Sequence, residues 1–338
     1  MTRREFACLK PDCTFGLTGT CIESIDDPTR KCPNLKATDA SSEPEQQVGN
    51  EGDTHPVANP ARQFPTGLEL GLNQAARIMR SRYTRLIGVL GQAEAGKTCL
   101  FTSLYLQLTG RNLCPKYRFA GSETLLGFEQ RARHLRDWTQ GRVPDQIVDR
   151  THLGNPRSPA FLHLAFHDDS GTRHDVLLPD LPGEWTTRLL SDASTAERFG
   201  FLRRSDIVLL ALEAPQFANR RTRNNAITDA THLLARLSDD ISVPRSIPLV
   251  LAVTKCDETD GSAPQDVQKI ADAALNRGYS VSTIPLAAFP RNGTTVPLGF
   301  GIDALVTQMS LPCVPLTTDT ARNIGSASRS YLKARGHR

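Results

Sequence analysis

The chain has 338 residues, and its 39% hydrophobic and 22% charged residues are typical of an ordinary globular protein. Its 40 Lys and Arg side chains against 36 Asp and Glu give a net charge of +4, too small to indicate nucleic acid or a membrane surface as a partner. The sequence shows neither a signal peptide nor an apolar run of the roughly 18 residues that a membrane span needs. We therefore expect a cytoplasmic protein.

Residues 1–36 are rich in cysteine and turn-forming residues. Four thiolates are enough to complete a tetrahedral zinc site, which is more plausible than disulfides in a reducing cytoplasm. The candidates are Cys8, Cys13, Cys21 and Cys32. Their spacing lacks the paired C-x₂-C form, so reduced thiols without metal remain the alternative. We expect a small zinc-binding module that serves docking, and metal analysis of protein purified without chelator would test it.

The segment from Ala37 to Gln63 contains no Leu, Ile, Phe, Met, Trp or Tyr. Such a segment cannot bury enough surface to offset the entropy of ordering, so we predict a flexible linker over residues 37–63. The apolar pattern resumes over residues 64–311, which we expect to form the main domain. Residues 312–338 are predicted to be a solvated basic tail. The tail contains Arg322, Arg329, Lys333, Arg335 and Arg338 against a single acidic residue, Asp319.

Short apolar runs alternate with helical patterns along the main domain. The runs are rich in Val, Ile, Leu or Phe, as strands buried on both faces should be. They cover residues 85–90, 160–167, 174–179, 206–212, 247–253 and 280–287. The alternation predicts an α/β fold with a doubly wound, mostly parallel sheet.

Helical periodicity is clearest in two places. Leu100, Phe101, Leu104, Tyr105 and Leu108 share one face of a helix after the first strand. Later, a second such face is formed by Val267, Ile270, Ala271, Ala274 and Leu275, and Gly278 suits the end of that helix. Residues 111–158 are a long insertion before the second strand, with a predicted helix from Glu123 to Gln140.

A phosphate-binding loop directly follows the first strand. Residues 91–98 fit G-x-x-x-x-G-K-[ST], and an amphipathic helix begins where this motif ends. The glycines let backbone N–H groups surround phosphates, and the positive end of the helix attracts them. Lys97 is expected to reach the β- and γ-phosphates, and the Thr98 hydroxyl to ligate Mg²⁺. The predicted phosphate-site residues are Gly91, Glu94, Ala95, Gly96, Lys97, Thr98 and Cys99.

The third predicted strand ends in Asp180-Leu-Pro-Gly183, which fits D-x-x-G. A carboxylate at this place can hold Mg²⁺, usually through a water molecule, and the glycine amide can sense the γ-phosphate. An ordinary turn could produce this tetrapeptide by itself. The tetrapeptide indicates a nucleotide site only because it follows the phosphate loop along the chain.

The fifth predicted strand ends in Thr254-Lys255-Cys256-Asp257, which fits the guanine-reading motif [NT]-K-x-D. A carboxylate at Asp257 can accept the N1–H and the 2-amino N–H of guanine, whereas adenine offers neither donor. The Lys255 stem is expected to pack over the base. All three motifs follow strands of one parallel sheet, at the edge where such folds bind ligands. Together they predict guanine-nucleotide binding, and Asp257 argues against an ATPase.

Two further parts of the site are predicted less directly. A threonine before the second strand should contact Mg²⁺ and the γ-phosphate, and Thr151 is better placed for this than Thr124. The backbone of Ala287 and Ala288, after the last strand, is expected to contact the base.

With these motifs, the chain resembles a TRAFAC-class GTPase and is most similar to the bacterial double-GTPase group. The resemblance extends over Phe64-Pro-Thr-Gly-Leu, the phosphate loop with Ser103-Leu-Tyr105, Phe119-Ala-Gly-Ser122, Asp180-Leu-Pro-Gly-Glu184, Cys13-Thr-Phe-Gly and Cys32-Pro-Asn-Leu. It implies a P-loop GTPase fold, Mg²⁺ with GTP or GDP, and protein partners that include a second GTPase encoded nearby. It also implies a role in bacterial conflict or defence, by association only.

Glu184 follows D-x-x-G where Ras-like enzymes carry a water-orienting Gln. A carboxylate beside the γ-phosphate is unfavourable unless it is protonated or paired. Glu184 is therefore a general base, a switch residue that faces away, or the sign of a slow GTPase that needs a partner, which we favour. The competing hypothesis is a GTP-controlled scaffold with negligible hydrolysis. The expected catalytic residues are Lys97, Glu184 and Thr151.

Overall fold

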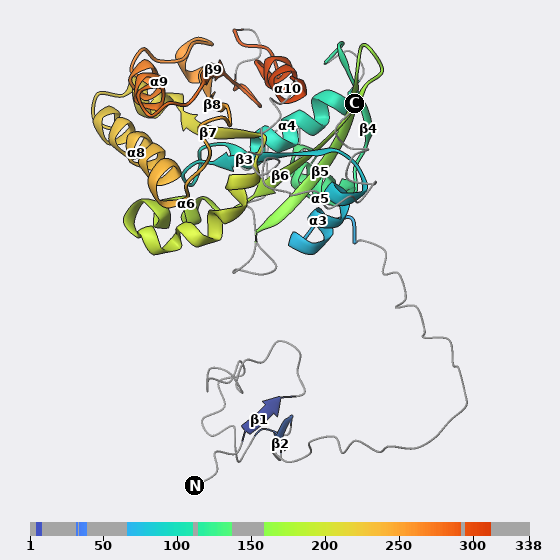
Figure 1. The fold of residues 1–338 in the computed structure, drawn as a ribbon. Coiled ribbons are helices and arrows are strands. Elements are labelled where there is room, and N and C mark those ends of the chain that lie inside the picture. Colours follow the sequence, from blue (N-terminus) through green and yellow to red (C-terminus); the bar gives the residue numbers. More distant parts are fainter. Residues whose placement is uncertain are drawn as a thin grey trace, which may run out of the picture. The chain divides into compact units, whose positions relative to one another are not determined.

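The computed structural model describes residues 5–8, 32, 34–38, 66–110, 114–136, 159–291 and 295–311 (Figure 1). The chain divides into two units, Met1–Arg62 and Gln63–Arg338. In the first unit, strand β1 (Glu5–Cys8) pairs antiparallel with β2 (Leu35–Thr38). The predicted zinc module and linker fall mostly outside the described residues, as do the tail and the part of the insertion that carries Thr151.

The described part of the second unit contains a seven-stranded sheet of order β4-β5-β6-β3-β7-β8-β9. The strands are β3 (Thr84–Leu90), β4 (Tyr117–Gly121), β5 (Ala160–Asp168), β6 (Arg173–Asp180), β7 (Ile207–Glu213), β8 (Leu249–Thr254) and β9 (Val281–Pro285). Strands β6, β3, β7, β8 and β9 run parallel, whereas β4 and β5 are antiparallel to their neighbours. The predicted mostly parallel sheet is confirmed.

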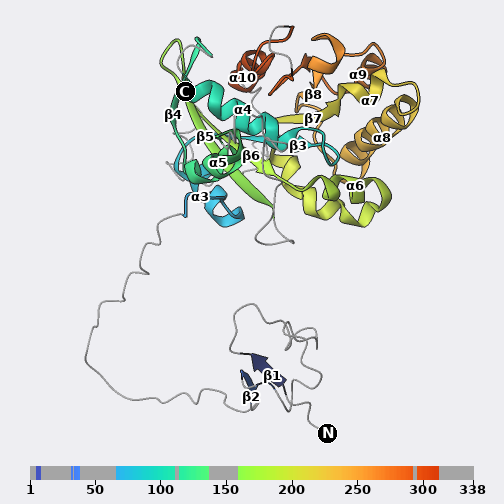
Figure 2. The same cartoon turned by 180° about the vertical axis from the view of Figure 1, so that it is seen from behind.

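Both faces of the sheet are covered by helices, as Figures 1 and 2 show. Residues of α4 (Lys97–Thr109), α5 (Leu125–Arg131) and α10 (Ile302–Ser310) share one apolar cluster. Residues of α6 (Gly183–Ser191), η2 (Ala193–Arg204), α8 (Arg223–Ala235), η3 (Arg236–Asp240) and α9 (Val267–Asn276) share the other. The remaining elements are α3 (Leu72–Ser81), η1 (Arg133–Arg136), α7 (Ala214–Ala218) and η4 (Cys256–Thr259).

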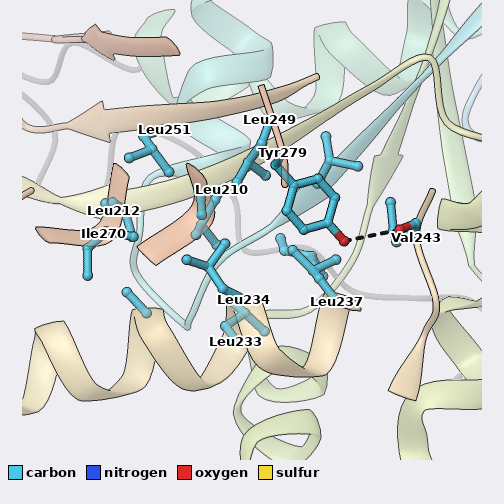
Figure 3. Close-up of a cluster of buried hydrophobic side chains, with 14 of the residues drawn as sticks. Leu210, Leu212, Leu233, Leu234, Leu237, Val243, Leu249, Leu251, Ile270 and Tyr279 are labelled. Carbon is cyan, nitrogen blue, oxygen red and sulfur yellow. Dashed lines mark hydrogen bonds between the residues drawn. The ribbon is translucent and has the colours of Figure 1, made fainter. Parts of the chain in front are cut away.

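Strand β8 lies in the interior of the sheet, and its side chains are buried on both faces. Leu249, Leu251 and Val253 pack on the α8 and α9 side, while Val250 and Ala252 pack on the α4 and α10 side. Because side chains alternate along a strand, a strand covered on both faces must be apolar at every position. Figure 3 shows the first of these clusters, in which the Tyr279 hydroxyl donates to the carbonyl oxygen of Val243 at 3.1 Å.

Three predictions about these elements were wrong in detail. In the described part of the helix expected over residues 123–140, the α-helix runs from Leu125 to Arg131 and is followed by the 3₁₀ helix η1, whereas residues 137–140 lie outside the described residues. Strand β8 begins at Leu249 because Pro248 has no N–H to donate to a sheet. Leu275 was expected on the buried face of α9 but is 53% exposed, and the last residue of that face is the neighbouring Ala274.

Strand β4 was not expected, because it lies within the stretch read as an insertion. It is an edge strand of five residues with little alternation, and it pairs antiparallel with β5 through an irregularity between Phe119 and Gly121. Short, irregular edge strands carry a weak apolar pattern, so a single sequence gives little sign of them.

Candidate functional site

The three predicted motifs lie at one edge of the sheet. Residues 91–98 follow β3, Asp180 ends β6 and Thr254 ends β8, and these strands are parallel. Ala160, the first residue of the antiparallel strand β5, pairs with Asp180. Strand β5 therefore begins at the same edge, and Thr151 is outside the described residues.

The backbone of the phosphate loop requires both of its glycines. Gly96 has φ 75°, a left-handed conformation that side chains disfavour, and it directly precedes α4. A Cβ at Gly91 would lie 2.8 Å from the Cβ of Ala211 and 3.0 Å from its carbonyl oxygen. The loop thus turns tightly from β3 into α4 while resting against β7.

Lys97 is buried beneath this loop. Its Nζ donates to the carbonyl oxygens of Gly91 at 2.7 Å and Gln92 at 2.8 Å. Burial lowers the pKa of Lys97 to about 8, although the negative charges of Asp180 and Glu184 act in the opposite direction. The ammonium group is therefore buried and donates to two carbonyl oxygens, and a bound anion would stabilise its charge further.

Thr98 and Cys99 continue from Lys97 along the first turn of α4, and both are half-buried. Burial raises the pKa of the Cys99 thiol, which keeps it neutral. Glu94 and Ala95 lie in the loop itself, where Glu94 has φ 65° and Ala95 is buried.

Asp180 is fully buried and bound to an arginine that the sequence did not point to. Arg131 Nε donates to Asp180 Oδ2 at 2.7 Å, and a second nitrogen of the same guanidinium lies 2.6 Å from that oxygen. The guanidinium also bonds to Glu69 and to the carbonyl oxygen of Gly127. Arg131 is 7% exposed, so this is a buried charge cluster next to the expected metal position.

Gly183 begins α6 in direct contact with the phosphate loop. A Cβ at Gly183 would lie 2.3 Å from both N and Cα of Ala93. Only a residue without a side chain permits this approach. The next residue, Glu184, is exposed on the first turn of α6 and lies close enough to Lys97 to influence its pKa.

Thr254 connects the guanine-reading motif to the phosphate loop. Its hydroxyl lies 3.0 Å from the carbonyl oxygen of Ala95 and 3.2 Å from that of Leu212. Lys255 follows with φ 56°, and its Nζ lies 2.5 Å from a carboxylate oxygen of Glu213 at the end of β7. The two motifs are therefore linked directly by contacts within the chain.

The loop after β9 lies beside Asp257. The Arg291 backbone N–H donates to Asp257 Oδ2 at 3.1 Å, which fixes the orientation of the carboxylate. Ala287 N–H donates to the carbonyl oxygen of Phe300, and the Ala288 carbonyl oxygen accepts from the Ser103 hydroxyl at 3.3 Å. The Cys256 N–H donates to the carbonyl oxygen of Leu286 at 3.0 Å, so the residues expected to surround a base are close to one another.

Thr124 is committed to a structural contact. It is fully buried, and its hydroxyl accepts the His163 backbone N–H at 2.9 Å. His163, in β5, accepts the Glu123 N–H at 3.0 Å and so holds the same turn. Thr151 is left as the better candidate for the metal-binding threonine. Within the described ranges, no group of three or more His, Cys, Asp or Glu could hold a metal, and the zinc site stays a prediction.

The fold and these motifs define a P-loop protein of the GTPase class. Residues 85–310 match the Double-GTPase 2 family, and the chain belongs to that family. Membership of this family agrees with the resemblance found in the sequence. No helix within the described ranges has the length and apolar character needed to cross a membrane.

Solved structures similar to this chain include the RocCORdC part of Methanosarcina barkeri Roco2 bound to GDP, with 16% identity and a TM-score of 0.35, covering 71% of this chain and 49% of that one. A variant of SsGBP shows 14% identity and a TM-score of 0.33, covering 71% and 62%. The signal recognition particle receptor SRb-GTP/SRX complex from Chaetomium thermophilum shows 15% identity and a TM-score of 0.34, covering 62% and 94%. The chain spans less than two thirds of the first two. No curated protein matches it.

Proposed function

We propose that the chain is a regulatory GTPase that binds Mg²⁺ with GTP or GDP at the carboxyl edge of the sheet. The observation that supports this most is the direct linkage of the three motifs, through Gly183 against Ala93 and Thr254 against Ala95. In this proposal Lys97 binds the β- and γ-phosphates. Thr98 and Thr151 ligate Mg²⁺, and Asp180 acts on it through water. These are oxygen donors, which suit Mg²⁺.

Guanine selection is assigned to Asp257, and Asp257→Asn should test it. The amide cannot accept both guanine N–H groups, so affinity for GDP should fall about 10²–10³-fold, while the 2-oxo group of xanthine can now accept from the new amide. Calorimetric titration with GDP and XDP measures both effects. Asp260→Asn makes the same change three residues away, at an exposed position, and should leave GDP affinity intact. Unchanged GDP affinity in Asp257→Asn would rule out this assignment.

Nucleotide affinity should depend on pH through Lys97. Its pKa of about 8 without nucleotide means that the ammonium is present below pH 8 and is lost as the pH rises above it. A bound phosphate needs the charged form, so affinity should be highest below pH 8 and then fall by up to about tenfold per pH unit. Fluorescent GDP titrations from pH 7 to 9 measure this. The Lys97→Arg protein keeps its charge over this range, so its affinity should change only through the titration of guanine itself. Identical pH profiles in the two proteins would contradict the role given to Lys97.

We propose that hydrolysis is slow without a partner, and Glu184 is the reason. An exposed carboxylate at this position adds negative charge beside the γ-phosphate instead of the neutral amide that orients water. Single-turnover hydrolysis should therefore be slow in the wild type and nearly unchanged in Glu184→Ala. Glu197→Ala, an exposed acid on η2, is the matched control. Rapid turnover that Glu184→Ala alone abolishes would instead make Glu184 a general base.

The partner is proposed to be a protein encoded nearby, such as a second GTPase, in a bacterial conflict or defence system. This rests on membership of the family and on no contact in the structure. Turnover measured with and without co-encoded proteins separates this proposal from a GTP-controlled scaffold. Acceleration favours the regulatory GTPase, and its absence with GTP-dependent self-association favours the scaffold.

A further inference from the structure

A cavity of about 280 Å³ lies on the far side of the phosphate loop, between this loop, the end of β7, α7 and α8. Of the residues assigned to the nucleotide site, Gly91, Glu94 and Ala95 line this cavity, whereas Lys97, Thr98, Asp180, Gly183 and Asp257 do not. The cavity therefore adjoins the nucleotide site and shares residues 91–95 with it, but it extends away toward α7 and α8.

The wall of this cavity combines an apolar floor with acidic groups. Leu210, Phe217 and Leu233 are buried and supply apolar surface. The charged residues of the wall are the carboxylates of Glu94, Glu213 and Asp229, and no Lys, Arg or His lines it. Lys255, outside the wall, pairs with Glu213. A long aliphatic side chain that ends in a cation fits this combination, because its stem can cover apolar surface while its charge meets a carboxylate.

Asp229 connects the cavity to the phosphate loop. Its Oδ2 accepts from Nε2 of Gln92 at 2.8 Å, so its partner there is a neutral amide and not a cation. The Gln92 carbonyl oxygen accepts from Lys97 Nζ. A cation that reaches Asp229 would therefore contact the same residue that positions the loop.

The chain itself carries a segment of the matching chemistry. Residues 312–338 contain five Lys or Arg and one acid, and Tyr331-Leu332 lie directly before Lys333. The segment follows Leu311 at the end of α10, on the opposite face of the sheet from α8. Its 27 residues can extend over roughly 90 Å, which is enough to pass around a domain of this size.

We propose that this cavity is a docking site for the basic C-terminal segment of the same chain, with a Lys or Arg of residues 312–338 bound at Asp229. The occupant is argued from charge complementarity and reach. Docking in this way places the C-terminal segment against the phosphate loop, where it can act on the nucleotide site without entering it.

A fluorescent peptide of residues 312–338 tests the proposal. The acceptor is the full chain in which the five basic tail residues are replaced by serine, so that its own tail does not compete. Saturable binding is expected, and it should weaken as salt rises. Asp229→Asn in the acceptor should reduce affinity by roughly ten- to a hundredfold, since it removes a charged partner yet keeps an oxygen for Gln92. Ala226→Trp, which fills the cavity from half-buried Ala226, should do the same.

Asp272→Asn removes an exposed carboxylate on α9, outside the cavity, and should leave peptide affinity unchanged. The chain with its natural tail should bind the peptide more weakly, because its own segment occupies the site. Absent binding, equal binding to Asp229→Asn, or equal binding to the chain with its natural tail would each overturn the proposal. Concentration-dependent dimers in sedimentation that vanish on tail neutralisation would assign the site to a second copy instead. Peptide binding is read without hydrolysis, so this result is independent of the proposed function.

Discussion

Replacing Arg131 with alanine is expected to lower the free energy of unfolding by about 3–5 kcal/mol. Arg131 is buried and its guanidinium serves two carboxylates, Asp180 and Glu69, together with the Gly127 carbonyl oxygen. Its removal leaves the fully buried Asp180 without a cation that now lies 2.6 Å away. Removing one member of a buried pair costs more than the net contribution of the pair, because the remaining carboxylate stays buried and loses the guanidinium that offset its burial. Urea denaturation without nucleotide measures the change.

Arg82→Ala is the matched control for this prediction. Arg82 also pairs with a buried carboxylate, that of Asp175, but its side chain is 36% exposed. Asp175 keeps Arg173 at 2.8 Å and His163 at 3.0 Å when Arg82 is removed. We expect a loss of at most about 1 kcal/mol. Equal losses in the two variants would mean that Arg131 is an ordinary ion-pair residue and not the neutralising partner of Asp180.

Gly183→Ala is expected to reduce GTP affinity about a hundredfold, because small displacements at a phosphate site have effects of that size. The added Cβ would lie 2.3 Å from backbone atoms of Ala93 and 2.8 Å from the carbonyl carbon of Gln92. Backbone atoms cannot rotate away as the end of a side chain can, so either the phosphate loop or the start of α6 must move. Titration with a fluorescent, non-hydrolysable GTP analogue measures the loss.

Gly200→Ala is the control, because it adds the same methyl group to a glycine that also lies in a helix. A Cβ at Gly200 meets nothing within 4 Å, and this glycine lies in η2, outside the site. The substitution should leave GTP affinity unchanged and should not lower stability. A Gly183→Ala protein that binds GTP as tightly as Gly200→Ala would show that the contact with Ala93 is not maintained when nucleotide binds.

The sequence was sufficient to predict the strands at the core and the edge that carries the three motifs. Strands β3, β7 and β8 are mostly apolar, and the phosphate loop and the guanine-reading motif directly follow β3 and β8, so local pattern and global position agree. The same agreement exists for residues of α4 such as Leu104. These signals are local, and a single sequence contains them.

Arg131 could not be predicted, because its role depends on a partner 49 residues away. An arginine near the end of an amphipathic helix is usually solvated, and its spacing from Asp180 follows no motif. The contact of Gly183 with Ala93 is equally invisible, since D-x-x-G indicates only a turn. The early end of α5 and the edge strand β4 lie in the same region, where tertiary contacts prevail over a weak local pattern.

The central claim is that this site binds a guanine nucleotide and reads its base through Asp257. Calorimetric titration of the full chain with GDP, GTP and ADP in the presence of Mg²⁺ tests it most directly. We predict stoichiometric binding of GDP and GTP, with ADP weaker by about 10⁴-fold or more. Comparable affinities for ADP and GDP, or no binding of any of the three, would contradict the account.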